Sequence, residues 1–204
     1  MKFKNFITGF QRFRNSLRRP SKKANIRKLA ERGETLDSFA FRDAVKEDIP
    51  ELGTLHAITW AETYNAANPN IRLRQSQWQK AFDEENDGSW FCIVIANKKN
   101  KLIGFAKGKI NTDKDSGGFH GELNKIYLLK DYQRLGLGKK LFGLVVQRFI
   151  NMGVNDMVLF GVPQNPSCIF HEAMGGERLY SKRGNFDGGY RWPDLKKHLH
   201  ELAG

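Results

Sequence analysis

A short glycine-rich stretch contains the residues of this chain whose types and spacing are best suited to chemistry. It reads Gln133-Arg134-Leu135-Gly136-Leu137-Gly138-Lys139 and lies between a run typical of a strand and a run typical of a helix. Glycine adopts backbone angles that other residues avoid, and it lets a ligand approach the main chain closely. The N–H groups and positive dipole at a helix start favour an anion, as do the side chains of Arg134, Lys139 and Lys140. The stretch therefore predicts a binding site for phosphate groups.

Two better-known glycine loops do not match this stretch. A Walker A loop needs Ser or Thr directly after Gly-Lys, whereas Lys140 follows Gly138-Lys139 here. A dinucleotide-binding loop needs a third glycine three positions after the second, where this chain has Leu141. The sequence thus argues against both kinds of nucleotide site.

With residues 124–129 before it, the stretch resembles the diphosphate-binding loop of the GNAT superfamily of acyl-CoA-dependent N-acetyltransferases. An ordinary glycine turn is the alternative. The resemblance implies that acetyl-CoA is the co-substrate, without a metal, and that the acetyl group passes directly to a primary amine of a small molecule or peptide. The donor-binding residues that it implies are Ile126, Tyr127 and Leu128 through their main chain, the loop residues Gln133, Arg134, Leu135, Gly136, Leu137, Gly138 and Lys139, and Asn165, Ser167 and Phe170.

Residues 165–176 resemble the second signature of the family, an asparagine followed by a short helix. Asn165 before Pro166 is also the pattern of a helix N-cap with proline in the first helical position, and both roles can hold together. His171 stands where the family usually has the tyrosine that protonates the leaving thiolate. The ordinary pKa of histidine is closer to neutral than that of a phenol, so His171 is the predicted acid, with a silent replacement as the alternative.

Glu122 is the predicted general base, because many family members carry a glutamate at this place in the strand before the loop. The alternative is a carboxylate satisfied by Lys125 or by backbone amides. Trp60 and Tyr64 resemble a pattern that forms the acceptor pocket in the family, with packing in the core as the alternative. His120 is a weaker candidate base, and Cys168 has no dedicated base partner, which disfavours a covalent intermediate.

The apolar spacing predicts the elements that position these residues. We expect strands at 39–42, 90–96, 101–110, 121–129, 157–162, 178–182 and 188–192, and helices at 47–64, 73–82, 137–152 and 165–174. Gly153 should end the third helix, and His198 with His200 should lie in a solvated tail. This order matches the GNAT core, an α/β (α+β) fold with a mixed, mostly antiparallel central sheet flanked by helices.

The net charge of +12 belongs to the N-terminal extension, residues 1–35, rather than to the predicted acetyltransferase domain, residues 36–204. Residues 1–30 hold ten Lys or Arg and no acid, so the other 174 residues have 24 basic and 22 acidic groups. This balance gives no indication of specific nucleic-acid binding. No apolar run reaches the length of about 20 residues that crosses a bilayer. With two cysteines, the chain is expected in a reducing compartment, the cytoplasm.

Residues 1–19 have the spacing of a basic amphipathic helix. Its role stays open between organelle targeting, peripheral membrane contact, and docking against the domain or a second subunit in a homodimer, with plain disorder as a further alternative. Two rival functions also stay open. One is a catalytically inactive acyl-CoA-binding protein of the same fold, and the other is a membrane-surface or interaction protein that acts through this segment. The sequence leaves the acceptor amine unidentified.

Overall fold

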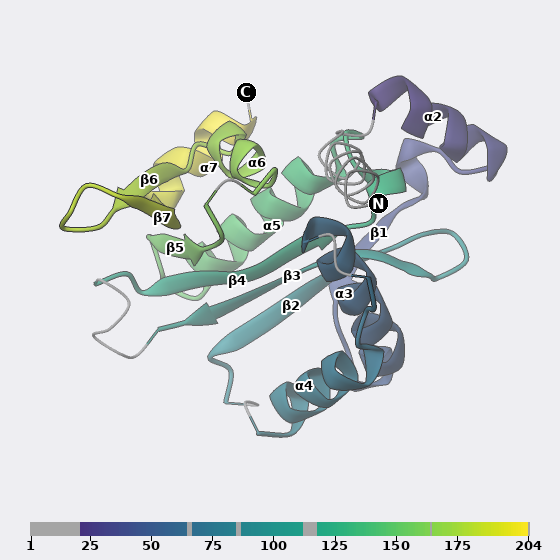
Figure 1. Ribbon diagram of the computed structural model, residues 1–204, viewed down its shortest axis with the longest axis horizontal. Helices are drawn as coiled ribbons and strands as arrows, with labels where there is room; N and C mark the ends of the chain where they lie inside the picture. Colours follow the sequence, from purple (N-terminus) through teal and green to yellow (C-terminus); the bar gives the residue numbers. More distant parts are fainter. Residues whose placement is uncertain (1–20, 65–66, 85–86, 112–117, 164, 204) are drawn as a thin grey trace, which may run out of the picture.

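A seven-stranded sheet forms the centre of the protein in a computed structural model, which describes residues 21–64, 67–84, 87–111, 118–163 and 165–203 (Figure 1). The strand order is β1-β2-β3-β4-β5-β7-β6, and only β4 and β5 are parallel. The strands are β1 (Ala40–Asp43), β2 (Trp90–Ala96), β3 (Leu102–Ile110), β4 (Gly121–Leu128), β5 (Met157–Phe160), β6 (Glu177–Tyr180) and β7 (Phe186–Trp192). The predicted mixed and mostly antiparallel sheet is confirmed.

Helices cover both faces of this sheet, which explains why β2 is apolar along its whole length (Figure 1). On one face lie α3 (Ile49–Tyr64) and α4 (Ile71–Glu84), which pack side chains such as Leu52 and Trp78 against Val94 and Phe105. On the other face lies α5 (Leu137–Asn151), with α7 (Leu195–Ala203) beside it. The short helix α6 (Cys168–Ala173) lies between β5 and β6 in the chain.

The strands β4 and β5 pair over two positions only, Gly121 with Met157 and Glu122 with Val158. Strand β4 then continues to Leu128, still paired with β3 on its other side. The register between β3 and β4 shifts between the pairs Lys107–Lys125 and Gly108–Leu123, which leaves Asn124 of β4 as the extra residue of a β-bulge. A bulge bends its strand, and this one accompanies the separation. Beyond Glu122, no described residue of β5 pairs with β4, so one edge of β4 offers main-chain groups to a ligand.

Several boundaries and two helices differ from the prediction. Helix α6 begins at Cys168 rather than at Asn165, because residues 165–167 form a turn in which the N–H of Cys168 donates to the carbonyl of Asn165 at 2.9 Å. Helix α7 was not predicted, and His198 is not in a solvated tail: its ring lies edge-on against Phe142 with centroids 6.0 Å apart. His200 is exposed, as expected. Gly153 ends α5 with a φ of 79°, which confirms its predicted role.

The second unpredicted helix is α2 (Lys22–Glu31), which lies beside the beginning of α5 (Figure 1). Its Leu29 is 3% exposed and belongs to the core on the α5 face. Residues 22–35 therefore contribute to the packing of the domain, and the boundary at residue 35 stays a prediction. The predicted basic helix of residues 1–19 lies outside the described residues. In the part of the chain that is described, no helix has the length and apolar character needed to span a membrane.

Candidate active site

The glycine-rich loop places a left-handed residue at the start of α5. Gly136 is the N-cap residue with φ 85° and ψ −14°, a conformation that costs glycine little and other residues more. No side chain caps this helix, and its first internal bond runs from the N–H of Lys140 to the carbonyl of Gly136. A Cβ atom at Gly136 would meet nothing within 4 Å. The N–H groups of the first turn therefore face space that an anion can enter.

Gly138 brings the loop and α6 together. A Cβ atom at this position would lie 3.2 Å from Cε2 of Phe170, closer than most real contacts of this kind. The two segments that the sequence analysis assigned to donor binding are thus in contact. This contact is local evidence that they form one site.

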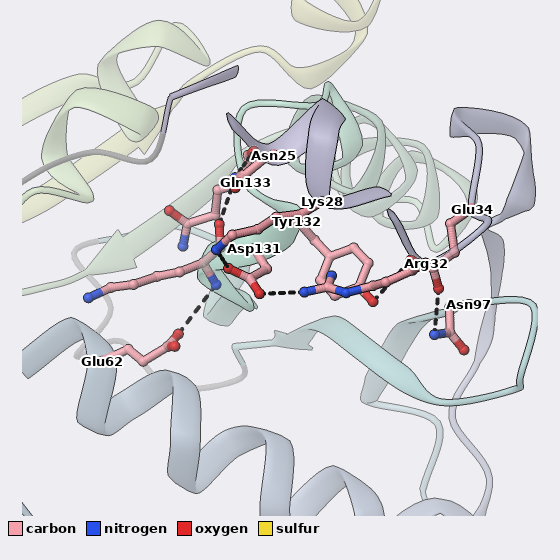
Figure 2. A network of polar contacts seen from close by, with 10 residues as sticks. Asn25, Lys28, Arg32, Glu34, Glu62, Asn97, Asp131, Tyr132 and Gln133 are labelled. Atoms are coloured by element: carbon pink, nitrogen blue, oxygen red, sulfur yellow. Dashed lines mark hydrogen bonds and ion pairs between the residues drawn. The ribbon is translucent and has the colours of Figure 1, made fainter. Parts of the chain in front are cut away.

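Helix α2 holds the segment before the glycines by direct polar contacts (Figure 2). The side-chain amide of Asn25, 2% exposed, donates from Nδ2 to the carbonyls of Lys130 at 2.8 Å and Gln133 at 2.9 Å. Lys28 and Arg32 form ion pairs with Asp131, and the hydrogen bond from Lys28 is the main cause that lowers the pKa of this carboxyl group. The 3₁₀ turn Lys130–Tyr132 (η4) is therefore fixed to α2 from one side.

Further contacts fix the same turn from other elements (Figure 2). Glu34 accepts from the hydroxyl of Tyr132 at 3.2 Å and from Nδ2 of Asn97 at 2.7 Å. Glu62 of α3 accepts from the N–H of Lys130 at 3.4 Å, and burial raises the pKa of its carboxyl group. The turn is thus held by α2, by α3 and by the β2–β3 connection before any ligand binds.

The predicted pantetheine contacts lie on the separated part of β4. Ile126 packs against the core on the α5 face, whereas Tyr127 packs on the opposite face, where its ring centroid is 5.7 Å from that of His56. The side-chain amide of Gln133 donates to the carbonyl of Leu128 at 2.9 Å, so the strand and the loop are joined directly. Along this part of β4, no described residue of β5 pairs with the main chain, which is what the predicted role requires.

The residues of the second signature occupy the turn before α6 and its buried face. The Oδ1 atom of Asn165 accepts from the N–H of Ser167 at 2.8 Å, which stabilises the turn without a ligand. Cys168 is a free cysteine and is buried, and its lack of a nucleophilic role stays a prediction. The contacts of Asn165, Ser167 and Phe170 with the donor stay predictions.

The ring of His171 is buried rather than open to a substrate. It is 5% exposed and lies between Phe170 and Tyr190, with ring centroids 5.6 and 5.4 Å away. Burial lowers its pKa to about 4, and its Nδ1 atom has no hydrogen-bond partner among the described residues. At neutral pH the ring is uncharged, so the proton-donor role of His171 stays a prediction that its environment does not favour.

Glu122 lies at the point where β4 leaves β5. Its side chain is 16% exposed; Oε1 accepts from Nδ2 of Asn124 at 2.7 Å, and Oε2 is 3.2 Å from Nζ of Lys109. The carboxylate thus has Asn124 and Lys109 as partners, and Lys125, named in the alternative, donates to Oδ1 of Asn124. His120 lies elsewhere, 71% exposed and 2.8 Å from Asp156, so geometry favours Glu122 over it as the base.

The aromatic pair lies at the end of α3, where Trp60 is half-buried and Tyr64 is exposed. The ring centroids of Trp60 and Tyr64 are 5.1 Å apart, and the guanidinium of Arg74 lies 5.1 Å from the centroid of Trp60. Neither ring belongs to the buried core. That Trp60 and Tyr64 bind the acceptor stays a prediction.

A cavity of about 390 Å³ lies beside Glu122, between α3, α4 and the sheet face of β3 and β4. We call it the basic cavity, because its wall includes Arg74, Lys80, Lys107, Lys109 and Lys125. Sequence reasoning missed it, since these residues are spread over more than 50 positions. The alternation of Lys107 and Lys109, which places both on one face of β3, was the available signal.

The sequence is similar to those of known proteins. The profile of the acetyltransferase (GNAT) family matches residues 52–175. The uncharacterized N-acetyltransferase YuaI of Bacillus subtilis (strain 168) is 31% identical over 162 residues, which cover 76% of this chain and 92% of the relative. A match of this extent places the chain in a sequence family and not only in a fold class.

The fold is also similar to solved structures at lower identity. The PaiA N-acetyltransferase from Thermoplasma acidophilum, in complex with coenzyme A, has a TM-score of 0.61 at 20% identity, covering 76% of this chain and 98% of that chain. The putative acetyltransferase YncA from Salmonella typhimurium, with acetyl-CoA, has a TM-score of 0.56 at 17% identity, covering 78% and 94%. These structures share the fold, and the sequence matches add the family. The chain therefore belongs to the acetyltransferase (GNAT) family of N-acetyltransferases.

Proposed function

We propose that this protein transfers the acetyl group of acetyl-CoA directly to a primary amine. The diphosphate of the donor binds to the first-turn N–H groups of α5 beside Gly136, and Arg134 and Lys139 add positive charge. The pantetheine arm pairs with the free main-chain edge of β4 at Ile126, Tyr127 and Leu128. The structural neighbours PaiA with coenzyme A and YncA with acetyl-CoA support this choice of donor.

The residues of the chain then divide the work of the transfer. The thioester supplies an acetyl group whose carbon forms a bond to the amine nitrogen as the carbon–sulfur bond breaks. Glu122, beside the end of the β4–β5 pairing, accepts the proton of the amine directly or through a water. The departing sulfur takes up a proton from water to leave as the free thiol, and Glu122 returns the proton of the amine to the solvent. Binding both reactants at one strand edge lowers the entropic cost of their encounter.

One observation carries this proposal: an uncapped helix start at a left-handed glycine lies next to a strand edge without a β5 partner. Gly136→Ala tests it, with Gly153→Ala as a matched control at the other end of α5. Both glycines have a positive φ, 85° and 79°, and a Cβ at either one would meet nothing within 4 Å. The two substitutions should therefore cost a similar free energy of unfolding, about 1–2 kcal/mol.

The two variants should differ in donor binding. The new methyl group at Gly136 enters the space that the diphosphate needs, so the Kd for acetyl-CoA should rise about tenfold or more in calorimetry. Gly153→Ala should leave this Kd unchanged. Equal acetyl-CoA affinities for the two variants would contradict the assignment of the loop.

A further inference from the structure

The side chain of Lys109 lies at the predicted general base. Lys109 of β3 is directly opposite Glu122 of β4 in the register of the sheet, so both side chains project from the same face. Nζ of Lys109 is 3.2 Å from Oε2 of Glu122. A base takes a proton from a group within about 2.6–3.2 Å, and this pair meets that condition. The chain therefore holds a primary amine of its own where the proposed function needs the amine of an acceptor.

Lys109 and the donor-binding part of β4 border the same space. The wall of the basic cavity includes Lys109, Asn124 and Lys125. Lys125 directly precedes Ile126, the first of the residues whose main chain is assigned to the pantetheine arm. The volume of about 390 Å³ is in the usual range for small-molecule sites, roughly 300–1,000 Å³. An acetyl group delivered along the edge of β4 can therefore meet the amine of Lys109 in this cavity.

The surroundings of Lys109 differ from those of its neighbour Lys107. Lys107 is 8% exposed, and its Nζ lies 4.5 Å from the ring centroid of Trp90 and 5.9 Å from that of Trp78. Such contacts with aromatic faces hold an ammonium in place. The side chain of Lys109 is 43% exposed, and its four-carbon stem is flexible. Lys109 thus has both the carboxylate partner and the freedom of movement that an attacking amine needs.

We propose that the protein acetylates its own Lys109 when acetyl-CoA is bound. This inference rests on the proposed function, since it uses the same donor and the same base. One proton of the Lys109 ammonium passes to Glu122 and from there to the solvent. The neutral nitrogen then forms a bond to the acetyl carbon as the carbon–sulfur bond breaks, and the electron pair of that bond goes to the sulfur. A second proton of the nitrogen reaches the sulfur through water, so CoA leaves as the free thiol.

The product, an Nε-acetyl-lysine, stays attached to the chain. Each chain therefore takes up a single acetyl group at this site and releases a single CoA, whereas an external amine allows repeated turnover. Acetylation removes the positive charge of the lysine, so it also ends the ion pair between Lys109 and Glu122.

Mass spectrometry of the full chain, incubated with acetyl-CoA and without an added amine, tests the proposal. The intact mass should rise by a single acetyl group, with release of an equal amount of thiol, and peptide mapping should place the group on Lys109. An unmodified Lys109 in a chain whose other lysines take up acetyl groups would overturn the inference.

Two matched substitutions identify the acceptor nitrogen. Lys109→Arg should abolish the uptake, because the guanidinium keeps a positive charge beside Glu122 but does not lose its proton. Lys101→Arg is the same change at an exposed lysine just before β3 and should leave the uptake unchanged. Equal uptake by the two variants would contradict the assignment of Lys109.

Two rate measurements separate enzymatic transfer from slow chemical acetylation of surface lysines. Glu122→Gln should lower the rate at Lys109 about 10²–10⁴-fold and leave the rate at Lys101 unchanged. The rate constant at Lys109 should also be independent of protein concentration, because the transfer takes place within a single chain. A rate constant that rises in proportion to the protein concentration, or that Glu122→Gln does not lower, would contradict the proposal.

Donor binding and an external amine separate this test from that of the proposed function. If calorimetry detects acetyl-CoA binding and an added primary amine is acetylated while Lys109 stays unmodified, the inference is wrong and the proposed function stands. If acetyl-CoA does not bind, the proposed function fails first and the inference falls with it.

Discussion

The contact between α2 and the turn before the glycine loop leads to a quantitative prediction. Asn25 is buried and donates two hydrogen bonds, 2.8 and 2.9 Å long, to the carbonyls of Lys130 and Gln133. Asn25→Leu keeps a side chain of similar size but removes both donors. Each lost bond costs about 0.5–1.5 kcal/mol, so the free energy of unfolding should fall by about 1–3 kcal/mol.

Losing these two hydrogen bonds should also weaken donor binding, because Gln133, which accepts one of them, is the first residue of the glycine loop. If acetyl-CoA binding must restore the position of the turn, up to the whole 1–3 kcal/mol appears in the binding equilibrium, roughly a 5- to 150-fold rise in Kd. Calorimetry with acetyl-CoA measures this value, and urea unfolding measures the loss of stability.

Arg27→Ala is the control for this experiment. Arg27 is on the same helix, its side chain is 82% exposed, and its ion pair with Glu31 is one that contributes little. This variant should change stability by less than about 0.5 kcal/mol and leave the Kd unchanged. If Asn25→Leu loses stability but binds acetyl-CoA as tightly as the wild type, α2 does not position the loop and the reasoning is refuted.

Two further predictions concern titrating groups. Glu122→Gln should lower kcat by about 10²–10⁴-fold with little change in the Kd for acetyl-CoA, whereas His120→Ala should leave both unchanged; normal turnover in Glu122→Gln would remove Glu122 as the base. Burial lowers the pKa of His56 to about 3 and that of His171 to about 4 in the folded state. Below pH 6.5 both histidines are protonated in the unfolded chain but not in the folded one, so unfolding is accompanied by the uptake of two protons. The free energy of unfolding should therefore decrease by about 2–3 kcal/mol for each unit by which the pH is lowered, between roughly pH 6 and 4. Urea unfolding of His171→Phe should show about half this slope, and an unchanged slope would contradict the buried, uncharged state of His171.

The sequence was most informative where one short segment determines the structure. The glycine loop, β2 and α5 were predicted closely, because turn chemistry and apolar periodicity both act over a few neighbouring residues. The main-chain role of residues 126–128 was expected only through the family resemblance, since the separation of β4 from β5 depends on pairing between distant strands. Boundaries near Asn165 shifted because a local turn competes with the helix start.

The missed features depend on contacts between distant segments. Helix α2 is mostly polar, and the buried Asn25 gives no apolar signal, so its helical pattern is weak. The basic cavity is assembled from four elements and has no continuous motif. A periodic signal for His171 did exist: Cys168, His171 and Met174 are three residues apart and all buried, which indicates an inward face of α6.

The central claim is that the start of α5 binds the diphosphate of coenzyme A, and calorimetry with a series of donor fragments tests it most directly. Dephospho-CoA keeps the diphosphate, whereas pantetheine lacks it. We expect CoA and dephospho-CoA to bind the full chain with Kd values within about tenfold of each other, and pantetheine to bind about 100-fold more weakly or not at all. No binding of CoA, or pantetheine binding as tightly as CoA, would contradict the account.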